Sequence, residues 1–260
     1  MIPTLTSYRQ IAKNVDASLQ RIATDPVVQR ETAYYEANIS KIKSIGDFMA
    51  DKRIYAYVLH AFGMDDIASS KALIRKILEG GVDTTRSLAN AMSDRRFRDL
   101  AETFNFARYG AATMSFTRTQ KGTVERYMRT TLEQTAGQTN EGVRLALYFQ
   151  RRAPEVTSIY QILGDKALYK VVETALSLPP SLSAIGLEKQ ASIVSQKLDI
   201  SSLADPQSTG RLIARFSNMW DLTHNSSSSS PVLQLFQSGP ASAISMDTLA
   251  SIQNLSVRRR

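Results

Sequence analysis

Apolar residues recur at intervals of three and four along most of the chain, which is the spacing of one face of an α-helix. Near the N-terminus the pattern comprises Tyr8, Ile11, Val15, Leu19 and Ile22. The same spacing predicts further helices at 52–62, 66–79, 95–107, 119–152, 166–177, 187–198 and 206–223. Val, Ile and Thr never alternate with polar residues over a useful length, as they do in half-buried strands. The pattern therefore predicts an all-α fold without a significant β-sheet.

Four aspartates share one local pattern, with apolar residues six, three and two positions before them and three positions after. They are Asp25, Asp51, Asp94 and Asp165. Aspartate is a favoured N-cap residue, because its carboxylate accepts hydrogen bonds from the free N–H groups that begin a helix. We therefore predict that a helix ends before each aspartate and another begins after it. The intervals between them are 26, 43 and 71 residues, too irregular for a solenoid. We expect an irregular multi-helix bundle built from helical hairpins.

Two segments interrupt the helical pattern. Leu178-Pro179-Pro180-Ser181 ends a helix, because proline has no backbone N–H to donate, and it is a candidate boundary between two sub-bundles. Residues 225–231 are rich in serine and predict a flexible linker. The linker would join a helical body at 1–224 to a C-terminal tail at 232–260 that contains a short helix. The tail either folds back on the body or docks on a partner, and its candidate partner-binding residues are Val232, Leu233, Leu235 and Phe236.

The segment 119–152 differs from the other predicted helices, because its ends are apolar and its centre is small and polar. The polar centre runs from Thr130 to Gly142. A helix with such a centre bridges two packed regions or presents a surface to a partner. The alternative, which we favour, is a solvent-exposed stretch with a frayed break at Gly137.

The residue types that carry chemistry are scarce. The chain contains no cysteine, which excludes disulfides, thiolate metal sites and cysteine nucleophiles. Its two histidines, His60 and His224, are far apart in the sequence, and a zinc site normally needs three or four ligands. The glycine-rich phosphate loops, the metalloprotease motif and the serine-hydrolase motif are all missing. We therefore predict no catalytic, metal or cofactor-binding residues, and a protein that is not an enzyme.

The net charge is +8, and most of it lies in the middle of the chain. Residues 71–152 carry fifteen basic and eight acidic side chains. Such a segment suits nucleic acid, an acidic membrane surface or an acidic partner, and it is equally compatible with an ordinary solvated surface. The candidate basic patch consists of Arg95, Arg96, Arg98, Arg118, Lys121, Arg126 and Arg129, with Arg108 beside them. Nucleic acid is the less favoured partner, because acidic residues and aromatic residues expected in the core are interspersed with these arginines.

The sequence contains no uninterrupted apolar run of the roughly 20 residues that a membrane-spanning helix needs, so we expect no transmembrane segment. The first residues lack the basic and apolar regions of a secretory signal, so export by a cleaved signal peptide is not expected. The sequence leaves the oligomeric state open.

Three segments together resemble a known family. They are 25–39, which begins Asp-Pro-Val-Val-Gln-Arg-Glu-Thr; 47–64, which begins Asp-Phe-Met-Ala-Asp; and 229–237, which reads Ser-Ser-Pro-Val-Leu-Gln-Leu-Phe-Gln. The chain resembles, from about residue 5 to residue 255, an alphaproteobacterial family catalogued as domain of unknown function 1217, whose members are encoded among flagellar genes. The motifs are helix caps and core positions, so the resemblance supplies no catalytic residues.

The resemblance implies association with the bacterial flagellum, in its structure or its assembly, with other flagellar proteins as partners. The implied location is the basal body or an axial structure, reached without a cleaved signal peptide; the alternative location is the cytoplasm. Two other functions stay open. One is a cytoplasmic export chaperone, and the other is a nucleic-acid-binding regulator that uses the basic segment 95–129.

Overall fold

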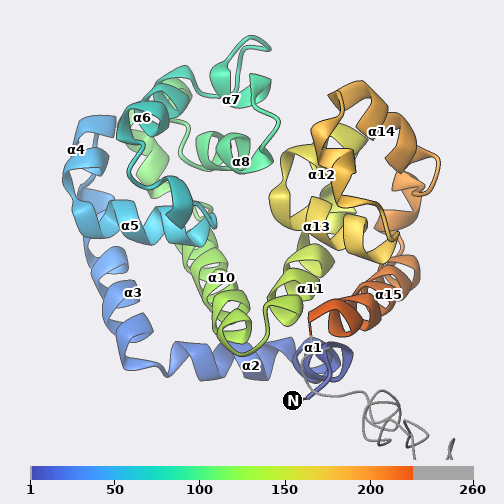
Figure 1. Ribbon diagram of the computed structural model, residues 1–260. Coiled ribbons are helices and arrows are strands. Elements are labelled where there is room, and N and C mark those ends of the chain that lie inside the picture. The colour runs from blue at the N-terminus through green and yellow to red at the C-terminus, as the bar shows by residue number, and fades with distance from the viewer. Residues whose placement is uncertain (1, 225–260) are drawn as a thin grey trace, which may run out of the picture. The chain divides into compact units, whose positions relative to one another are not determined.

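The computed structural model describes residues 2–224, and every regular element among them is a helix (Figure 1). This confirms the predicted all-α fold. The α-helices are α1 (Thr4–Lys13), α2 (Val15–Ala23), α3 (Pro26–Asn38), α4 (Ile45–Ala50), α5 (Lys52–Ala61), α6 (Lys71–Gly80), α7 (Leu88–Ala91), α8 (Arg95–Thr103), α9 (Phe106–Tyr109), α10 (Lys121–Thr139), α11 (Glu141–Arg152), α12 (Ile159–Gly164), α13 (Lys166–Ala175), α14 (Leu187–Ser195) and α15 (Pro206–His224). Short 3₁₀ helices are η1 (Ile39–Lys41), η2 (Asp65–Ile67), η3 (Gly110–Ser115), η4 (Ala153–Glu155), η5 (Pro180–Ala184) and η6 (Ile200–Ala204).

One compact unit runs from Met1 to Trp220, and Asp221 begins a second unit. The predicted linker at 225–231 and the predicted tail at 232–260 lie outside the described residues. The same holds for the four candidate partner-binding residues of the tail, Val232, Leu233, Leu235 and Phe236.

All four aspartates of the repeated pattern cap helices. Asp25 accepts hydrogen bonds from the backbone N–H groups of Val27 (2.8 Å) and Val28 (3.2 Å) at the start of α3. Asp51, Asp94 and Asp165 accept equivalent bonds at the starts of α5, α8 and α13. A helix therefore ends at or shortly before each aspartate and another begins directly after it, as the sequence predicts.

The apolar residues form two clusters within the compact unit. The first core gathers the buried faces of α3 to α9 around Phe48, Leu78 and Phe104, and it includes Tyr127 near the start of α10. The second core gathers Tyr8 of α1 with the buried faces of α11 to α15. The α10–α11 hairpin joins them, because α10 packs on α5 of the first core and α11 packs on α13 of the second.

Stacked aromatic rings fix α10 in the first core. Tyr57 of α5 lies between Tyr35 of α3 and Tyr127 of α10, with ring centroids 4.5 Å and 3.9 Å apart. The Tyr57 hydroxyl lies 3.0 Å from the Thr32 hydroxyl, so its polar end is satisfied inside the core. Burial of these rings raises the pKa of Tyr57.

The predicted helix at 119–152 is two helices, and this corrects the sequence prediction. The chain turns at Asn140, whose backbone is extended and whose side chain accepts a hydrogen bond from the N–H of Gly142 (2.9 Å) to cap α11. The expected break at Gly137 was wrong, since Gly137 is helical and packs against the Arg144 side chain. An asparagine N-cap thus reverses the chain three residues beyond the glycine.

Two other predicted helices are shorter than expected. The helix predicted at 66–79 begins at Lys71, after η2. The helix predicted at 95–107 ends at Thr103, because Asn105 accepts a hydrogen bond from the N–H of Arg108 (3.1 Å) and caps the separate helix α9. The chain also leaves helix α13 before 178–181. Leu178 and, just after this segment, Leu182 are buried in the second core, which therefore continues across it.

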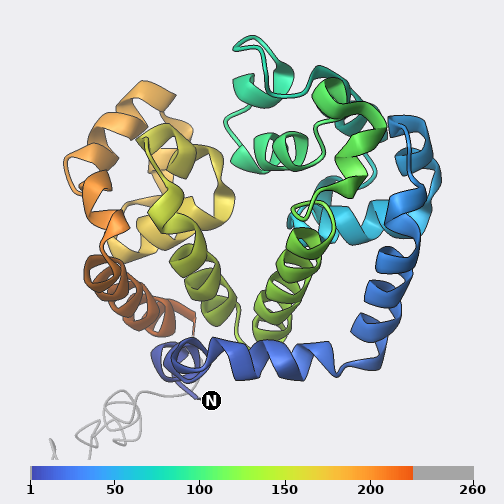
Figure 2. The same ribbon diagram turned by 180° about the vertical axis from the view of Figure 1, so that it is seen from behind.

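Helices α1 and α2 lie across the turn of the α10–α11 hairpin, as the two opposite views show (Figures 1 and 2). The Asn140 side-chain amide donates a hydrogen bond to the buried hydroxyl of Thr4 (2.9 Å). A Cβ on Gly142 would lie 2.5 Å from the Trp220 ring, so α11 and α15 approach closely only because this residue is glycine. The N-terminal helices therefore lock the turn that joins the two cores.

We expect replacement of Asp51 by alanine to lower the free energy of unfolding by about 1 kcal/mol, because α5 loses its N-cap. Asp51→Asn should retain most of the stability, since an amide oxygen still accepts the bonds from Arg53 and Ile54. Urea denaturation followed by circular dichroism measures both. Equal losses in the two variants would contradict the assignment of the cap.

Candidate functional site

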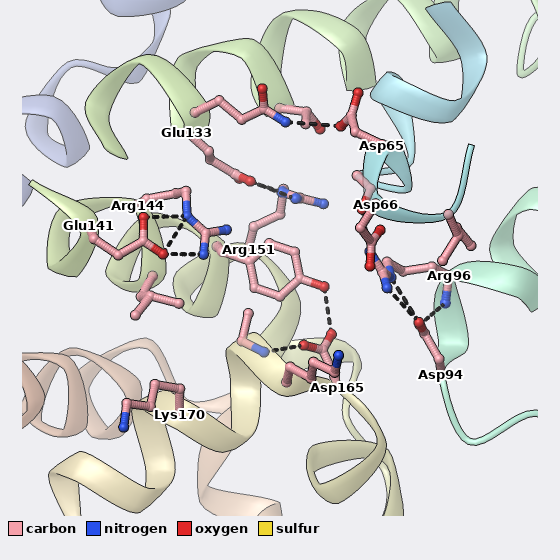
Figure 3. A pocket seen from close by; sticks show the side chains of 18 of the residues that line it. Asp65, Asp66, Asp94, Arg96, Glu133, Glu141, Arg144, Arg151, Asp165 and Lys170 are labelled. Carbon is pink, nitrogen blue, oxygen red and sulfur yellow. Dashed lines mark hydrogen bonds and ion pairs between the residues drawn. The ribbon is translucent and has the colours of Figure 1, made fainter. Parts of the chain in front are cut away.

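A cleft of about 770 Å³ lies between the two cores (Figure 3). Its walls come from η2 and α8 of the first core, from α11 and α13 of the second, and from α10. Charged side chains of both signs dominate the lining: Asp65, Asp66, Asp94, Glu133, Glu141, Asp165, Arg96, Arg144, Arg151, Lys166 and Lys170. Its chemistry therefore depends on how these charges are matched.

One face of α11 supplies a polar stripe to the cleft. Arg144, Tyr148 and Arg151 are spaced four and three residues apart, which places them on the same side of a helix. The Arg144 Nε lies 2.9 Å and 2.8 Å from the two carboxylate oxygens of Glu141, one turn earlier. This pair is partly exposed at the cleft edge.

The Arg151 guanidinium binds the Glu133 carboxylate in bidentate fashion, with distances of 2.7 Å and 2.9 Å. The Glu133 side chain is only 5% exposed, so a strong partner has to compensate for its loss of hydration. Burial alone would lower the pKa of Arg151, but the Glu133 charge outweighs it and raises that pKa. The pair ties α10 to α11 on the cleft side.

Asp165 has two roles. One carboxylate oxygen caps α13, and the other accepts a hydrogen bond from the Tyr148 hydroxyl at 2.5 Å. Burial, together with the negative charge of Asp165, raises the pKa of Tyr148, which keeps the phenol neutral as a donor. Asp94 acts similarly on the opposite wall, since it caps α8 and binds Arg96 at 2.8 Å.

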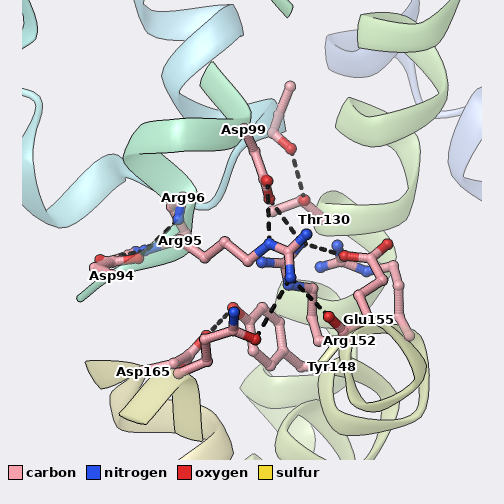
Figure 4. Close-up of polar contacts among 12 residues, drawn as sticks. Asp94, Arg95, Arg96, Asp99, Thr130, Tyr148, Arg152, Glu155 and Asp165 are labelled. Carbon is pink, nitrogen blue, oxygen red and sulfur yellow. Dashed lines mark hydrogen bonds and ion pairs between the residues drawn. The ribbon is translucent and has the colours of Figure 1, made fainter. Parts of the chain in front are cut away.

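A second ionic network lies beside the cleft and crosses from one core to the other (Figure 4). The Arg152 Nη1 of α11 lies 2.7 Å from Asp99 of α8 and 2.8 Å from Glu155 of η4. The Arg95 guanidinium of α8 donates to the backbone carbonyl of Glu155 (2.6 Å). Arg152 is buried, so polar contacts take the place of apolar packing where the two cores meet here.

A close backbone approach accompanies these ion pairs. A Cβ on Gly164 would lie 2.7 Å from the carbonyl oxygen of Ser93, closer than real Cβ contacts come. Gly164 therefore lets the end of α12 touch the segment between α7 and α8.

His60 lies at the edge of the cleft in a hydrogen-bonded series. Its Nδ1 is 3.0 Å from Asp65, and its Nε2 is 3.1 Å from the Thr131 hydroxyl. A hydroxyl, an imidazole and a carboxylate follow one another in the same order in the catalytic triad of hydrolases, where they act as nucleophile, general base and orienting acid. The Thr131 hydroxyl also donates a hydrogen bond to the Tyr127 carbonyl (2.8 Å), one turn earlier in α10. The series therefore connects α5, η2 and α10.

The structure separates the predicted basic patch into two groups. Arg95 and Arg96 are engaged in the ionic contacts above, and the Arg126 guanidinium lies 5.1 Å from the centre of the Phe62 ring, where burial lowers its pKa. Arg98 is exposed on α8, and Arg129 is half-exposed on α10. The others, Arg108, Arg118 and Lys121, gather between α9 and the start of α10.

Apart from Arg96, sequence reasoning named none of the cleft's ionic partners as a site residue. The spacing of Arg144, Tyr148 and Arg151 is a signal that could have revealed the polar face of α11. The partner of Arg151 was hidden, because Glu133 precedes the unrecognised turn at Asn140.

Within residues 2–224, no three histidine, aspartate or glutamate side chains group closely enough to hold a metal ion. In the same range, every helix is too short or too polar to cross a membrane.

Comparison with known proteins shows the family. The profile of the family described as protein of unknown function (DUF1217) matches residues 61–209, which is more than half of the chain. The chain belongs to the DUF1217 family. The matched segment contains every cleft-lining residue except Trp220.

This DUF1217 protein is also similar to a solved structure, the crystal structure of protein AGR_C_984 from Agrobacterium tumefaciens. The two are 43% identical, the match covers 85% of this chain and 94% of the other, and the TM-score is 0.80. No protein with a curated description matches the chain.

We expect Arg152→Met in this DUF1217 protein to lower the free energy of unfolding by about 2 kcal/mol, because the largely buried Asp99 carboxylate keeps only its longer contact with Arg95 (3.8 Å). The double variant Asp99→Asn, Arg152→Met should lose less than the single one. Arg30→Met, which breaks the exposed pair with Glu31, is the control and should cost less than about 1 kcal/mol. Urea denaturation measures all three, and equal losses in Arg152→Met and Arg30→Met would contradict the role of Arg152.

The contribution of the His60–Asp65 contact to the free energy of unfolding should depend on pH. Partial burial would raise the pKa of Asp65, but the hydrogen bonds from His60 and Gln134 outweigh it, so the pKa lies below its ordinary value. The contribution of Asp65 is therefore present above that ordinary value and is lost as the pH falls through the lowered folded value. The difference in unfolding free energy between the wild type and Asp65→Asn should shrink from about pH 5 to about pH 3. A constant difference would contradict it.

Proposed function

We propose that the protein is a non-enzymatic component of the bacterial flagellum, in its structure or its assembly, and that it acts through contacts with other proteins. The observation that carries the first part is the pairing of the cleft charges. The buried carboxylates of Glu133 and Asp165 already bind protein groups, as do the guanidinium groups of Arg96 and Arg151. A catalytic site instead needs a base or nucleophile free to react with substrate.

The His60 series supports the same interpretation. Its geometry resembles that of a hydrolase, yet the hydroxyl proton of Thr131 is donated to a helix carbonyl. Both ring nitrogens of His60 are engaged with protein side chains, those of Asp65 and Thr131. This arrangement connects α5, η2 and α10.

Support for the flagellar part comes from the resemblance to a family whose members are encoded among flagellar genes. The proposed location is the basal body or an axial structure, reached without a cleaved signal peptide. A cytoplasmic export chaperone has the same genetic context and would differ from a structural component in where the protein is found.

A nucleic-acid-binding regulator has less support. It would require Arg95 and Arg96 to contact phosphates, but these side chains bind Glu155, Asp94 and the Gly63 carbonyl. Breaking these contacts would remove part of the connection between α8 and its neighbours.

Deletion of the gene tests the proposal. We expect cells that lack it to swim poorly and to carry fewer or altered filaments, scored by motility in soft agar and by electron microscopy. Unaffected flagella would overturn the flagellar assignment. Immunoblotting of cytoplasm, purified basal bodies and culture medium then separates a structural component from a chaperone, because only the former leaves the cytoplasm in a manner that depends on the flagellar export channel.

A further inference from the structure

Three residues of the predicted basic patch gather around one tyrosine. The guanidinium groups of Arg108 and Arg118 lie over the Tyr109 ring, 5.4 Å and 5.3 Å from its centre. Arg118 also lies 4.9 Å from the centre of the Phe116 ring, and the two rings meet edge to face at 4.9 Å. Lys121 follows at the first position of α10. Arg108, Arg118 and Lys121 are exposed, while the two rings are half-buried.

Buried hydrogen bonds hold this segment in place. The Thr119 hydroxyl donates to the carbonyls of Thr113 (2.8 Å) and Phe116 (2.7 Å), and the Thr113 hydroxyl donates to the Asn105 carbonyl (3.1 Å). The hydroxyl of Tyr35 in the first core donates to the Thr119 carbonyl. Thr113 and Thr119 are fully buried, so the core fixes the segment that carries Arg118.

The stacking leaves the binding edges of the arginines available. A guanidinium group that stacks on an aromatic ring uses its flat face and keeps its N–H edge for a carboxylate. Among residues 2–224, Arg118 and Lys121 have no carboxylate partner. Arg108 has Asp83 at 3.5 Å, an exposed pair.

We propose that the surface formed by Arg108, Tyr109, Phe116, Arg118 and Lys121, the arginine–tyrosine surface, binds a carboxylate-rich segment of a partner protein. The argument is charge complementarity: Arg118 and Lys121 are positioned, exposed cations without a carboxylate partner among residues 2–224, and such cations suit carboxylates. The inference rests on the proposed function, since it supplies the chemistry of the protein contact. Single-stranded nucleic acid is less well matched, because bases stack on open aromatic faces and arginines already cover these two rings.

Binding of two defined probes tests the proposal on the full-length protein. Fluorescence anisotropy would compare an oligoglutamate peptide of about ten residues with an oligothymidine of similar charge, at about 50 and 200 mM salt. The test variant is Arg118→Glu, Lys121→Glu. The matched control is Lys189→Glu, Lys197→Glu, which changes two exposed cations near α14 and alters the net charge equally.

We expect the peptide to bind the wild type and the control alike, and to bind the test variant about tenfold more weakly. Phe116→Leu, which keeps apolar bulk but removes the ring, should weaken binding to a smaller extent. The inference is overturned by equal losses in the test and control variants, by a wild type that does not bind the peptide at low salt, or by tighter binding of the oligothymidine that the test variant loses.

Complementation of the deletion strain separates this inference from the proposed function. If the deletion impairs motility, the control variant should restore it and the test variant should not. Full restoration by the test variant would overturn the arginine–tyrosine surface and leave the flagellar function standing. A deletion without effect would overturn the flagellar function, and the peptide titration would then decide the binding surface alone.

Discussion

The structure depends on the reversal of the chain at Asn140 and on the matching of charge that this reversal requires. The turn places α10 and α11 side by side, with the first core on one and the second core on the other. Between them lie charged groups that lose much of their contact with water. A buried charge without a partner costs several kcal/mol, so the two cores can approach only where each buried acidic side chain contacts a basic one. Glu133 with Arg151 and Asp99 with Arg152 satisfy that condition.

Such a junction differs from an apolar one in what it specifies. Apolar surfaces tolerate small displacements, whereas a bidentate pair such as Arg151–Glu133 fixes both the distance and the orientation of two helices. Arg151 and Arg152 are adjacent in sequence, so they leave α11 in different directions and contact different helices. One secures α10 and the other secures α8, and the cleft remains open to water beside them. Polar geometry thus contributes to the relative placement of the two cores.

The sequence was sufficient for most of the long helices and for the helix starts that follow the four aspartates, because capping and helical periodicity are local. The aspartates Asp51 and Asp165, like the other two of the repeated pattern, are recognisable as caps from their neighbours in the chain alone. The hairpin turn is not, because its signal is an asparagine in a polar stretch that also contains a glycine, the more obvious helix breaker. That error concealed the cleft. In one continuous helix, Glu133 and Arg151 would be separated by roughly 27 Å, since each residue adds about 1.5 Å, whereas the turn brings them to 2.7 Å. Long-range contacts such as Asp99–Arg152 have no local signal at all.

The hydrogen bond between Asn140 and Thr4 joins residues that are 136 positions apart. During synthesis, α1 and α2 therefore cannot reach their final position until more than half of the chain has been made, while the first core can assemble from residues already made. Under a pulling force on the first residues, we expect α1 and α2 to detach before either core unfolds. The α10–α11 turn would then lose its contacts with these two helices first. The N-terminal segment thus docks only after α11 has been made, and it is the first part to detach under such a pull.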